Sequence, residues 1–260
     1  MEIVLDNVSF SYNDKVVLRN FSCKFRDGRI SAIVGKCGSG KSTLLEIIDG
    51  LLVPSGSISN IDRSKIGFLF QNAYEQVFNS TVYKEIEFSL NCFMIGDKDK
   101  RIREAIKLVG LDDSYLGRNP FKLSNGELQR VALASILVHD PDVVLLDEPT
   151  VGLDNNSKHD LLRLIRSLKN DYKKTVIIVD HDISFLHSFV DDVFLIKDGG
   201  LFLEGDKYDV FSNEEAMNEC GLKVPDVLHF SNLVLKKKNI KIGYRDHVND
   251  LLKDVYRFVK

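Results

Sequence analysis

Apolar residues in this chain fall into short runs with two different spacings. Before residue 35, the runs at 8–10 and 21–25 alternate between apolar and polar positions, the period of two expected of a strand with one buried face. Four later runs are almost continuously apolar, as in strands buried inside an α/β sheet: 30–34, 66–70, 143–146 and 174–179. We therefore expect antiparallel N-terminal strands that lead into an α/β core.

Residues 81–138 carry helical spacing instead. This spacing predicts helices at 81–93, 97–109 and 124–138, and a further helix is expected at 155–169. Two turns are also predicted, one at Pro54-Ser55-Gly56 and one at Gly199-Gly200, where two strands form a hairpin. A helical segment thus interrupts the α/β pattern of the chain.

The last 45 residues form a separate segment. Val224-Pro225 interrupts the chain, and helices are expected at 226–235 and 246–259. Lys236, Lys237 and Lys238 lie between them and are interpreted as a solvated turn. The last helix carries an apolar stripe, which either packs on its own domain or forms a partner surface: Val248, Leu251, Leu252, Val255, Tyr256 and Val259.

Composition narrows the possible classes of protein. The 260 residues suffice for one large α/β domain with a small appendage. The net charge of -3 implies no general affinity for nucleic acid, and four cysteines without C-x-x-C spacing indicate reduced thiols. No signal peptide and no membrane-spanning run are expected. A role in a membrane process would therefore be that of a peripheral subunit.

One motif matches the phosphate-binding pattern G-x-x-x-x-G-K-[ST] between a predicted strand and a predicted helix. Its glycines let backbone N–H groups surround a phosphate, the second lysine reaches the β- and γ-phosphates, and the serine can bind Mg²⁺. An ordinary glycine-rich turn is the alternative, but spacing and context both argue against it. The candidate nucleotide-binding residues are Gly35, Lys36, Cys37, Gly38, Ser39, Gly40, Lys41, Ser42 and Thr43.

Polar residues follow the other buried strands. Asp147 and Glu148 end one strand, where the first suits Mg²⁺ binding and the second suits polarising a water. Gln71 and His181 follow two more strands, at the edge where α/β sheets bind ligands. Solvated acids, a loop glutamine and a structural histidine are the alternatives. The phosphate motif favours the functional interpretation of the acids.

Two further positions leave their interpretation open. Tyr12 could stack on a purine or be a half-buried turn residue. Ser124 and Glu127 form a capping box that opens a helix. That helix start is either simply well capped, or it is a second anion site with Ser124 and Gly126 directed at a phosphate.

Taken together, residues 1–212 resemble the ATP-binding-cassette (ABC) ATPases. The resemblance implies an α/β P-loop NTPase fold with an N-terminal antiparallel β subdomain, a RecA-like core and an inserted helical subdomain at about 72–140. It divides the chain into a nucleotide-binding domain, 1–215, and a C-terminal helical dimerisation extension, 216–260. It also implies the cofactors ATP and Mg²⁺.

The resemblance assigns roles to the candidate residues. Residues 35–42 match the Walker A loop, with Ser42 and Gln71 near the metal. Asp147 binds Mg²⁺ and Glu148 is the catalytic carboxylate, assisted by Gln71 and His181 as the Q-loop and switch residues. Tyr12 stacks on adenine, Asp154 is the D-loop aspartate, and Ser124 with Gly126 belongs to the signature motif. The sequence departs from the family at Asn125, which replaces the first signature glycine.

Within that family, two stretches resemble the ATPase subunits of energy-coupling factor (ECF) transporters. These are residues 70–82, with Ala73 where proline is common, and the tail from Cys220 to Pro225. The resemblance implies a peripheral ATPase on the cytoplasmic face of the cell membrane that works as a head-to-tail dimer. Its partners would be a second ATPase subunit, an integral membrane coupling subunit and a substrate-binding membrane subunit, with no nucleic acid.

The expected function is ATP hydrolysis that powers import of a vitamin or a transition-metal ion. One alternative is the ATPase subunit of an ordinary ABC importer or exporter. The other is a soluble ABC protein outside transport, but such proteins usually carry two cassettes, long coiled coils or basic insertions, and the sequence contains none of these.

Overall fold

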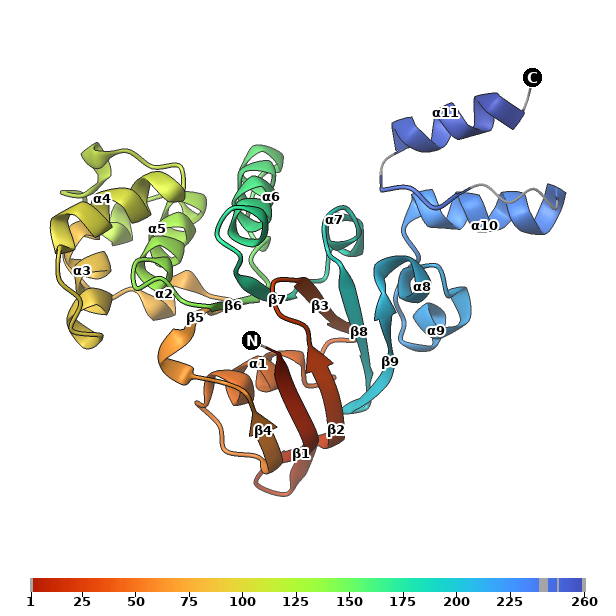
Figure 1. Cartoon of the computed structure of the whole chain (residues 1–260), viewed down its shortest axis with the longest axis horizontal. Coiled ribbons are helices and arrows are strands. Elements are labelled where there is room, and N and C mark those ends of the chain that lie inside the picture. The colour runs from red at the N-terminus through yellow and green to blue at the C-terminus, as the bar shows by residue number, and fades with distance from the viewer. Residues whose placement is uncertain (1, 239–242, 247, 259–260) are drawn as a thin grey trace.

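An antiparallel sheet forms the N-terminal part of the molecule, as the alternating pattern predicts. The computed structural model describes residues 2–238, 243–246 and 248–258. The sheet has the strand order β2-β1-β4 and lies at the bottom of Figure 1. In β2, Leu18, Phe21, Cys23 and Phe25 are buried while polar residues between them face outward. Its strands are β1 (Ile3–Tyr12), β2 (Lys15–Phe25) and β4 (Ser55–Ser59).

A second sheet of six strands forms the centre of the molecule, in the order β5-β6-β7-β3-β8-β9. All neighbours are parallel except β8 and β9, which form the predicted hairpin. Because the first five strands run the same way, their carboxyl ends meet at one edge. The strands are β3 (Ile30–Gly35), β5 (Ile66–Leu69), β6 (Val143–Asp147), β7 (Thr175–Val179), β8 (Asp192–Lys197) and β9 (Gly200–Asp206).

Two hydrophobic cores cover the two faces of this sheet. Leu145 packs with α1 (Lys41–Asp49) and the antiparallel sheet, whereas Leu146, on the other face, packs with α5 (Asn125–Leu137) and α6 (Asn155–Asn170). Adjacent strand residues point to opposite faces, so continuous apolar runs supply both cores. This explains why the central strands show no alternation.

The helical subdomain lies at one end of the molecule (Figure 1, left). Its three main helices lie within the predicted ranges, with Thr81, Asp97 and Ser124 as their N-caps, and the cap at Ser124 matches the sequence prediction. The short α2 has no apolar period long enough to predict it. The elements are α2 (Ala73–Gln76), α3 (Val82–Cys92), α4 (Lys98–Leu108) and α5, with short turns η1 (Arg63–Lys65), η2 (Asp113–Tyr115) and η3 (Pro120–Lys122).

Two sequence predictions are wrong. Ser55 and Gly56 do not form a turn but begin β4, where Ser55 pairs with Ser9 and Gly56 has a φ of +86° next to a register shift. The lysine run is not a turn either, because it ends α10 (Asp226–Lys238). Positive side chains suit a helix carboxyl end.

After β9, the described part of the chain forms four helices: α8 (Lys207–Phe211), α9 (Glu214–Glu219), α10 and α11 (Val248–Phe258). Met217, Cys220 and Leu228, the last of these near the start of α10, pack into the main core, whereas the carboxyl end of α10 and α11 extend away from it (Figure 1, upper right). In α11, Val248 and Leu252 are exposed and Leu251 is buried. The side chains of Val255 and Tyr256, and all of Val259, lie outside what the structure describes. No helix among the described residues could cross a membrane.

Candidate functional site

The phosphate motif forms a tight loop between β3 and α1. Gly35 pairs with Ile196 of β8, and an added Cβ there would collide with the Ile196 carbonyl oxygen. Gly38 and Gly40 adopt φ values of +77° and +100°, which favour glycine. Gly40 is the N-cap of α1. The glycines therefore let the loop curl directly into the helix.

The Lys41 side chain folds over this loop. Its Nζ donates to the carbonyl oxygens of Gly35 (2.9 Å) and Lys36 (2.8 Å). Burial lowers the pKa of Lys41 from its ordinary value. A phosphate is a stronger acceptor for this ammonium than two carbonyl oxygens. The loop thus holds a buried positive charge where an anion would bind.

Asp147 lies at the end of β6 and is also buried. Burial is the main cause that raises the pKa of Asp147 to about 6, and a hydrogen bond from Ser42 opposes it. Within the described residues, its Oδ1 has no hydrogen-bond partner. A carboxylate oxygen free to coordinate, beside a serine hydroxyl, fits the donor set that Mg²⁺ takes.

Glu148 is held between two other strand ends. Its Oε2 accepts from Gln71 Nε2 at 2.7 Å, and its Oε1 lies 2.6 Å from His181 Nε2. Glu148 has a φ of +47°, and its N–H donates to Val179 O, which fixes the backbone across β6 and β7. The side chain is 11% exposed. The structure thus brings the predicted residues Gln71 and His181 to the carboxylate of the predicted Glu148.

Sequence reasoning missed Asp180, the residue that orders this edge. Asp180 is buried and accepts from both the N–H and the hydroxyl of Thr150 and from Asp182 N. Burial raises the pKa of Asp180 from its ordinary value. It ties the turn that carries His181 to the segment after Glu148. The available signal was an acid directly after a buried strand, within Asp180-His181-Asp182.

Tyr12 lies against α1, just beyond the phosphate loop. Its hydroxyl donates to Glu46 Oε2 at 3.1 Å and also bonds to the Thr43 side chain. The ring is 46% exposed and meets Phe10 edge-on at 4.9 Å. Tyr12 is therefore about half open to solvent, next to α1, the helix that follows the phosphate loop. Among the other loop residues, Lys36 and Cys37 are exposed and Ser39 is buried.

Ser124 and Gly126 lie away from the phosphate loop of their own chain. Their helix α5 packs on β5, and β6 and β7 separate β5 from β3. Ser124 N and Oγ both donate to Glu127 Oε2 at 2.8 Å, so the predicted capping box is present. Asn125 accepts a bond from Tyr74 Oη. Asp154 caps α6 by accepting from Ser157 N at 2.7 Å.

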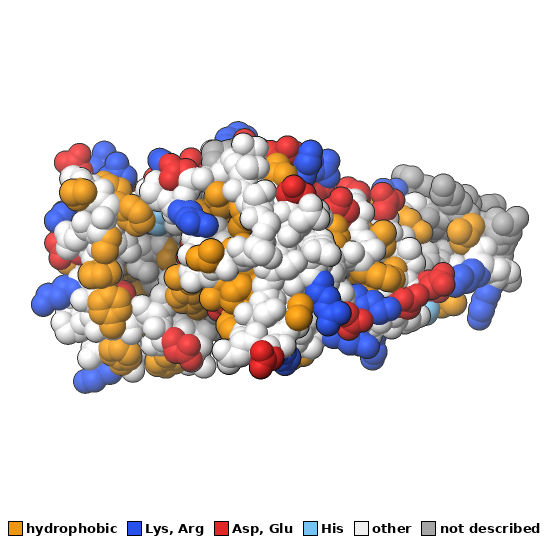
Figure 2. Space-filling model, turned by 90° about the horizontal axis from the view of Figure 1, so that it is seen from below, with side chains coloured by type: hydrophobic (Ala, Val, Ile, Leu, Met, Phe, Trp, Pro, Cys, Tyr) orange, Lys and Arg blue, Asp and Glu red, His pale blue; other side chains and the backbone are white. Residues whose placement is uncertain are grey.

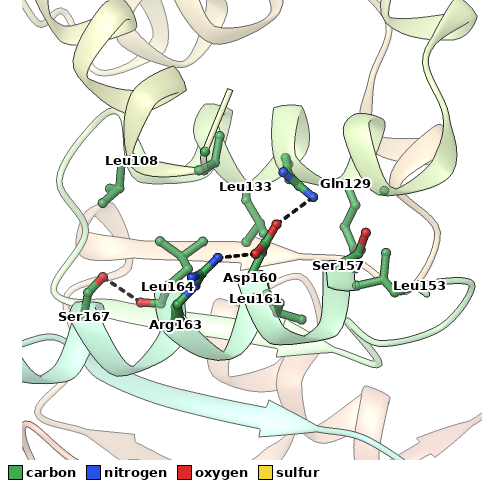
Figure 3. Close-up of a pocket in the computed structure, with 14 residues that line it drawn as sticks. Leu108, Gln129, Leu133, Leu153, Ser157, Asp160, Leu161, Arg163, Leu164 and Ser167 are labelled. Carbon is green, nitrogen blue, oxygen red and sulfur yellow. Dashed lines mark hydrogen bonds and ion pairs between the residues drawn. The ribbon is translucent and has the colours of Figure 1, made fainter. Parts of the chain in front are cut away.

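Two hollows border this second group. One, of about 310 Å³, lies between α2, α5 and the loop after β6, with Gln71, Tyr74, Asn125 and Val151 on its walls. The other, of about 400 Å³, lies between α5 and α6. Figure 3 shows leucines lining it and Asp160 reaching toward Arg163, and Asp160 also pairs with Arg130 of α5 at 3.2 Å. This ion pair joins the helical subdomain to the core.

Comparison with known proteins points to one family. The family model described as ABC transporter matches residues 18–151. An energy-coupling factor transporter ATP-binding protein, EcfA2 of Clostridium perfringens, is 34% identical over 251 residues, which cover 88% of each chain. EcfA3 of Oenococcus oeni, with the same general description, is 35% identical and covers 96% of this chain and 92% of its own.

Solved structures that resemble this chain belong to the same family. The structure of cbiO1 from C. perfringens, described as part of the ABC transporter complex cbiONQ, has a TM-score of 0.73 at 30% identity. It covers 88% of this chain and 98% of that one. A dimeric cassette bound to ADP and Pi, MJ0796, has a TM-score of 0.71 at 29% identity and covers 79% and 98%. The likeness includes most of the described fold.

Proposed function

The chain belongs to the ABC transporter ATPases, in the group of energy-coupling factor ATP-binding proteins, and on that premise we propose that it powers import of a micronutrient through separate membrane subunits. The chain is an ATP hydrolase, as its family is. The observation that carries the catalytic proposal is the carboxylate of Glu148, held between Gln71 and His181 at the strand edge beside the phosphate loop.

In the proposed reaction, Glu148 accepts the proton of the attacking water. Gln71 and His181 orient its two oxygens, and the low exposure of the side chain limits the number of waters that reach them. Lys41 keeps its bonds to the carbonyl oxygens of Gly35 and Lys36, donates its third N–H to a phosphate oxygen and offsets the charge that develops there. Tyr12 contacts the adenine.

A Mg²⁺ ion fits at Asp147, the residue before Glu148. Asp147 and Ser42 would hold it, with Gln71 near its coordination shell, and the unpartnered Oδ1 of Asp147 supports the assignment. When bound, the ion neutralises charge on the β- and γ-phosphates. Its double charge also favours the ionised form of Asp147, which burial alone disfavours.

The separation of α5 from the phosphate loop supports a shared site. Ser124 and Gly126 lie at an exposed helix start, where N–H groups favour an anion, yet two strands stand between them and their own loop. A second ATPase chain, placed head to tail, would bring its own signature segment to this loop. Asn125 would take part through its backbone, with its side chain oriented by Tyr74.

The surface of the helical subdomain supports a membrane partner. Figure 2 shows hydrophobic side chains gathered at that end of the molecule (left). Phe78, Phe88 and Met94 are exposed, and the two phenylalanine rings stack edge-on at 4.8 Å. Exposed apolar side chains that gather on one surface support a protein interaction site there. A short helix of an integral coupling subunit would enter the hollow near Gln71 and Tyr74.

The tail and the relatives support the remaining partners that we propose. Exposed Val248 and Leu252 on α11 would contact the extension of the second ATPase subunit. A separate membrane subunit would bind the vitamin or transition-metal ion. The chain would then sit as a peripheral subunit on the cytoplasmic face of the cell membrane. ATP hydrolysis would separate the two cassettes and transmit motion through Gln71 to the membrane subunit.

The test is capture of the tagged chain from its own membranes in mild detergent, followed by mass spectrometry. We expect an integral coupling subunit and a small substrate-binding membrane protein. Tyr74→Asp should reduce their yield strongly, whereas Tyr172→Asp, at an exposed site after α6, should not. Capture of transmembrane subunits without a small substrate-binding membrane protein would instead support an ordinary ABC importer or exporter. If no membrane protein is captured, a role in transport is contradicted.

A further inference from the structure

The C-terminal tail touches the phosphate loop at one glycine, Gly221. This residue follows α9 in the left-handed conformation, with a φ of +63°. Its N–H donates to Asn218 O, and Leu222 N donates to Met217 O, both at 2.9 Å. These bonds close the helix end in the way that glycine favours. The turn therefore presents bare backbone to whatever lies beside it.

Lys36, the second residue of the phosphate motif, lies across that bare backbone. A Cβ added at Gly221 would be 3.4 Å from Lys36 Cδ, 3.3 Å from Nζ and much closer than 3.0 Å to Cε. Real Cβ atoms do not approach carbon atoms so closely. Any other residue at 221 therefore forces the Lys36 side chain out of this position.

The backbone of Lys36 in turn holds the residue that is central to the site. Its carbonyl oxygen accepts from Lys41 Nζ at 2.8 Å and from Ser39 N at 3.2 Å. Lys36 thus links Gly221 to the Lys41 ammonium: its side chain contacts Gly221, and its carbonyl oxygen accepts from Lys41.

The Gly221 turn is itself firmly held. Glu219, the last residue of α9, pairs with Lys197 Nζ at 2.7 Å, and Lys197 follows Ile196, the partner of Gly35 in the sheet. Met217 and Cys220 are 0% and 1% exposed. Because α9 is fixed to the same strand as the loop, a clash at Gly221 moves Lys36 rather than the turn.

We propose that Gly221 is a positioning residue for ATP binding. By leaving room for the Lys36 side chain, it sets the Lys36 carbonyl and, through it, the Lys41 ammonium. The nucleotide site then includes a residue of the tail, and its affinity depends on how that tail is seated. The proposal rests on the proposed role of the phosphate loop as the ATP site.

The first experiment compares Gly221→Ala with Gly28→Ala. Gly28 has nearly the same φ, +64°, but an added Cβ there meets nothing within 4 Å, so it controls for backbone strain alone. We expect Gly221→Ala to raise the Kd and KM for ATP by about 3- to 10-fold while kcat stays within about twofold. Gly28→Ala should leave all three unchanged.

A double-mutant cycle tests whether Gly221 acts on ATP binding through Lys36. In a Lys36→Ala background there is no side chain to displace, so Gly221→Ala should no longer weaken ATP binding. An unchanged Kd for Gly221→Ala alone, or equal weakening with and without Lys36, overturns the proposal. Lys41→Ala tests the underlying function separately, because retention of ATP binding there would reject the loop as the site.

Hydrogen exchange on the unmodified protein gives a check that needs no variant. By linkage, a residue that influences ATP affinity is itself influenced by ATP. The amides of residues 217–222 should exchange more slowly with ATP than without it, by about threefold or more. If their exchange is the same in both states, the proposal fails even where Gly221→Ala is too unstable to assay.

Discussion

Glu148, the proposed catalytic base, shows how the structure holds a single side chain in place. It occupies a positive φ that non-glycine residues seldom adopt, and its backbone is held by a bond to Val179 O. Strained positions of this kind persist where the surrounding structure over-determines them. Here the strain presents both carboxylate oxygens to the side chains of Gln71 and His181.

Glu148→Gln should lower the rate of ATP hydrolysis by about 100-fold or more, because an amide cannot accept the proton from water. ATP binding should persist, since the phosphate loop is untouched. Phosphate release and equilibrium binding of ATP measure the two effects. Normal turnover in this variant would show that Glu148 is not the base.

Cys37 offers a chemical handle on the same loop. It is exposed, as is Cys92, whereas Cys23 and Cys220 are buried. N-ethylmaleimide should block ATP binding, because the adduct would fill the space of the phosphates, and ATP added first should protect. A Cys37→Ser protein should resist the reagent although Cys92 still reacts. Equal inactivation with and without ATP would show that Cys37 does not lie in the ATP site.

At the scale of elements, helix caps determine where the functional segments begin. The capping box of α5 involves both side-chain oxygens of Glu127, one on Ser124 and one on Tyr115 Oη at 2.7 Å. The Tyr115 hydrogen bond and those of Ser124 lower the pKa of Glu127 to about 2. One carboxylate thus fixes the start of the signature helix against η2.

This pKa predicts a pH dependence. Because the folded pKa of Glu127 is below its ordinary value of 4.5, ionised Glu127 stabilises the fold above about pH 4.5. That contribution is lost as pH falls from about 4.5 toward 2. In urea unfolding, wild type should exceed Glu127→Gln at pH 7, and the difference should shrink by pH 3. If the difference in unfolding free energy between wild type and Glu127→Gln is the same at pH 7 and pH 3, the lowered pKa of Glu127 is contradicted.

A second polar cluster attaches the tail to the helix that follows His181. Asp246 lies 2.7 Å from Lys207 Nζ and accepts from Tyr208 Oη at 2.7 Å, while His187, the last residue of α7 (Ile183–His187), lies 3.9 Å away. Tyr244 also donates to Asn232 of α10 at 3.1 Å. Residues 243–246 are thereby seated on the core.

Asp246→Ala should lower the free energy of unfolding by about 1–3 kcal/mol, because it leaves the largely buried Lys207 without its carboxylate. Asp209→Ala, at an exposed position on α8, should change it by less than about 0.5 kcal/mol. Denaturant unfolding at pH 7 measures both. Equal effects would show that Asp246 does not anchor the tail.

At the scale of the whole molecule, the two segments of the proposed ATP site lie apart within one chain. The phosphate loop follows β3, and the signature segment lies beyond β5. We expect one chain to bind ATP but to hydrolyse it slowly. The rate per chain should rise with protein concentration or on addition of the second ATPase subunit. A rate that stays constant across about 100-fold dilution in both cases would contradict a shared site.

The sequence by itself determined the elements and the chemistry at their ends. Strand and helix periods are local, so continuous apolar runs identified buried strands and placed Gln71, Asp147, Glu148 and His181 at their carboxyl ends. The capping box of Ser124 and Glu127 is local as well. The motif spacing predicted a phosphate loop because its glycines and lysine act within nine residues.

Only the tertiary structure decided which of these residues meet. The bond between Gln71 and Glu148 spans 77 positions, and Ser55 forms a strand rather than a turn because it pairs with Ser9, 46 positions away. The contact of Lys36 with Gly221 has no local signature at all. Such contacts depend on how sheets and helices pack, and local periodicity contains no record of that packing.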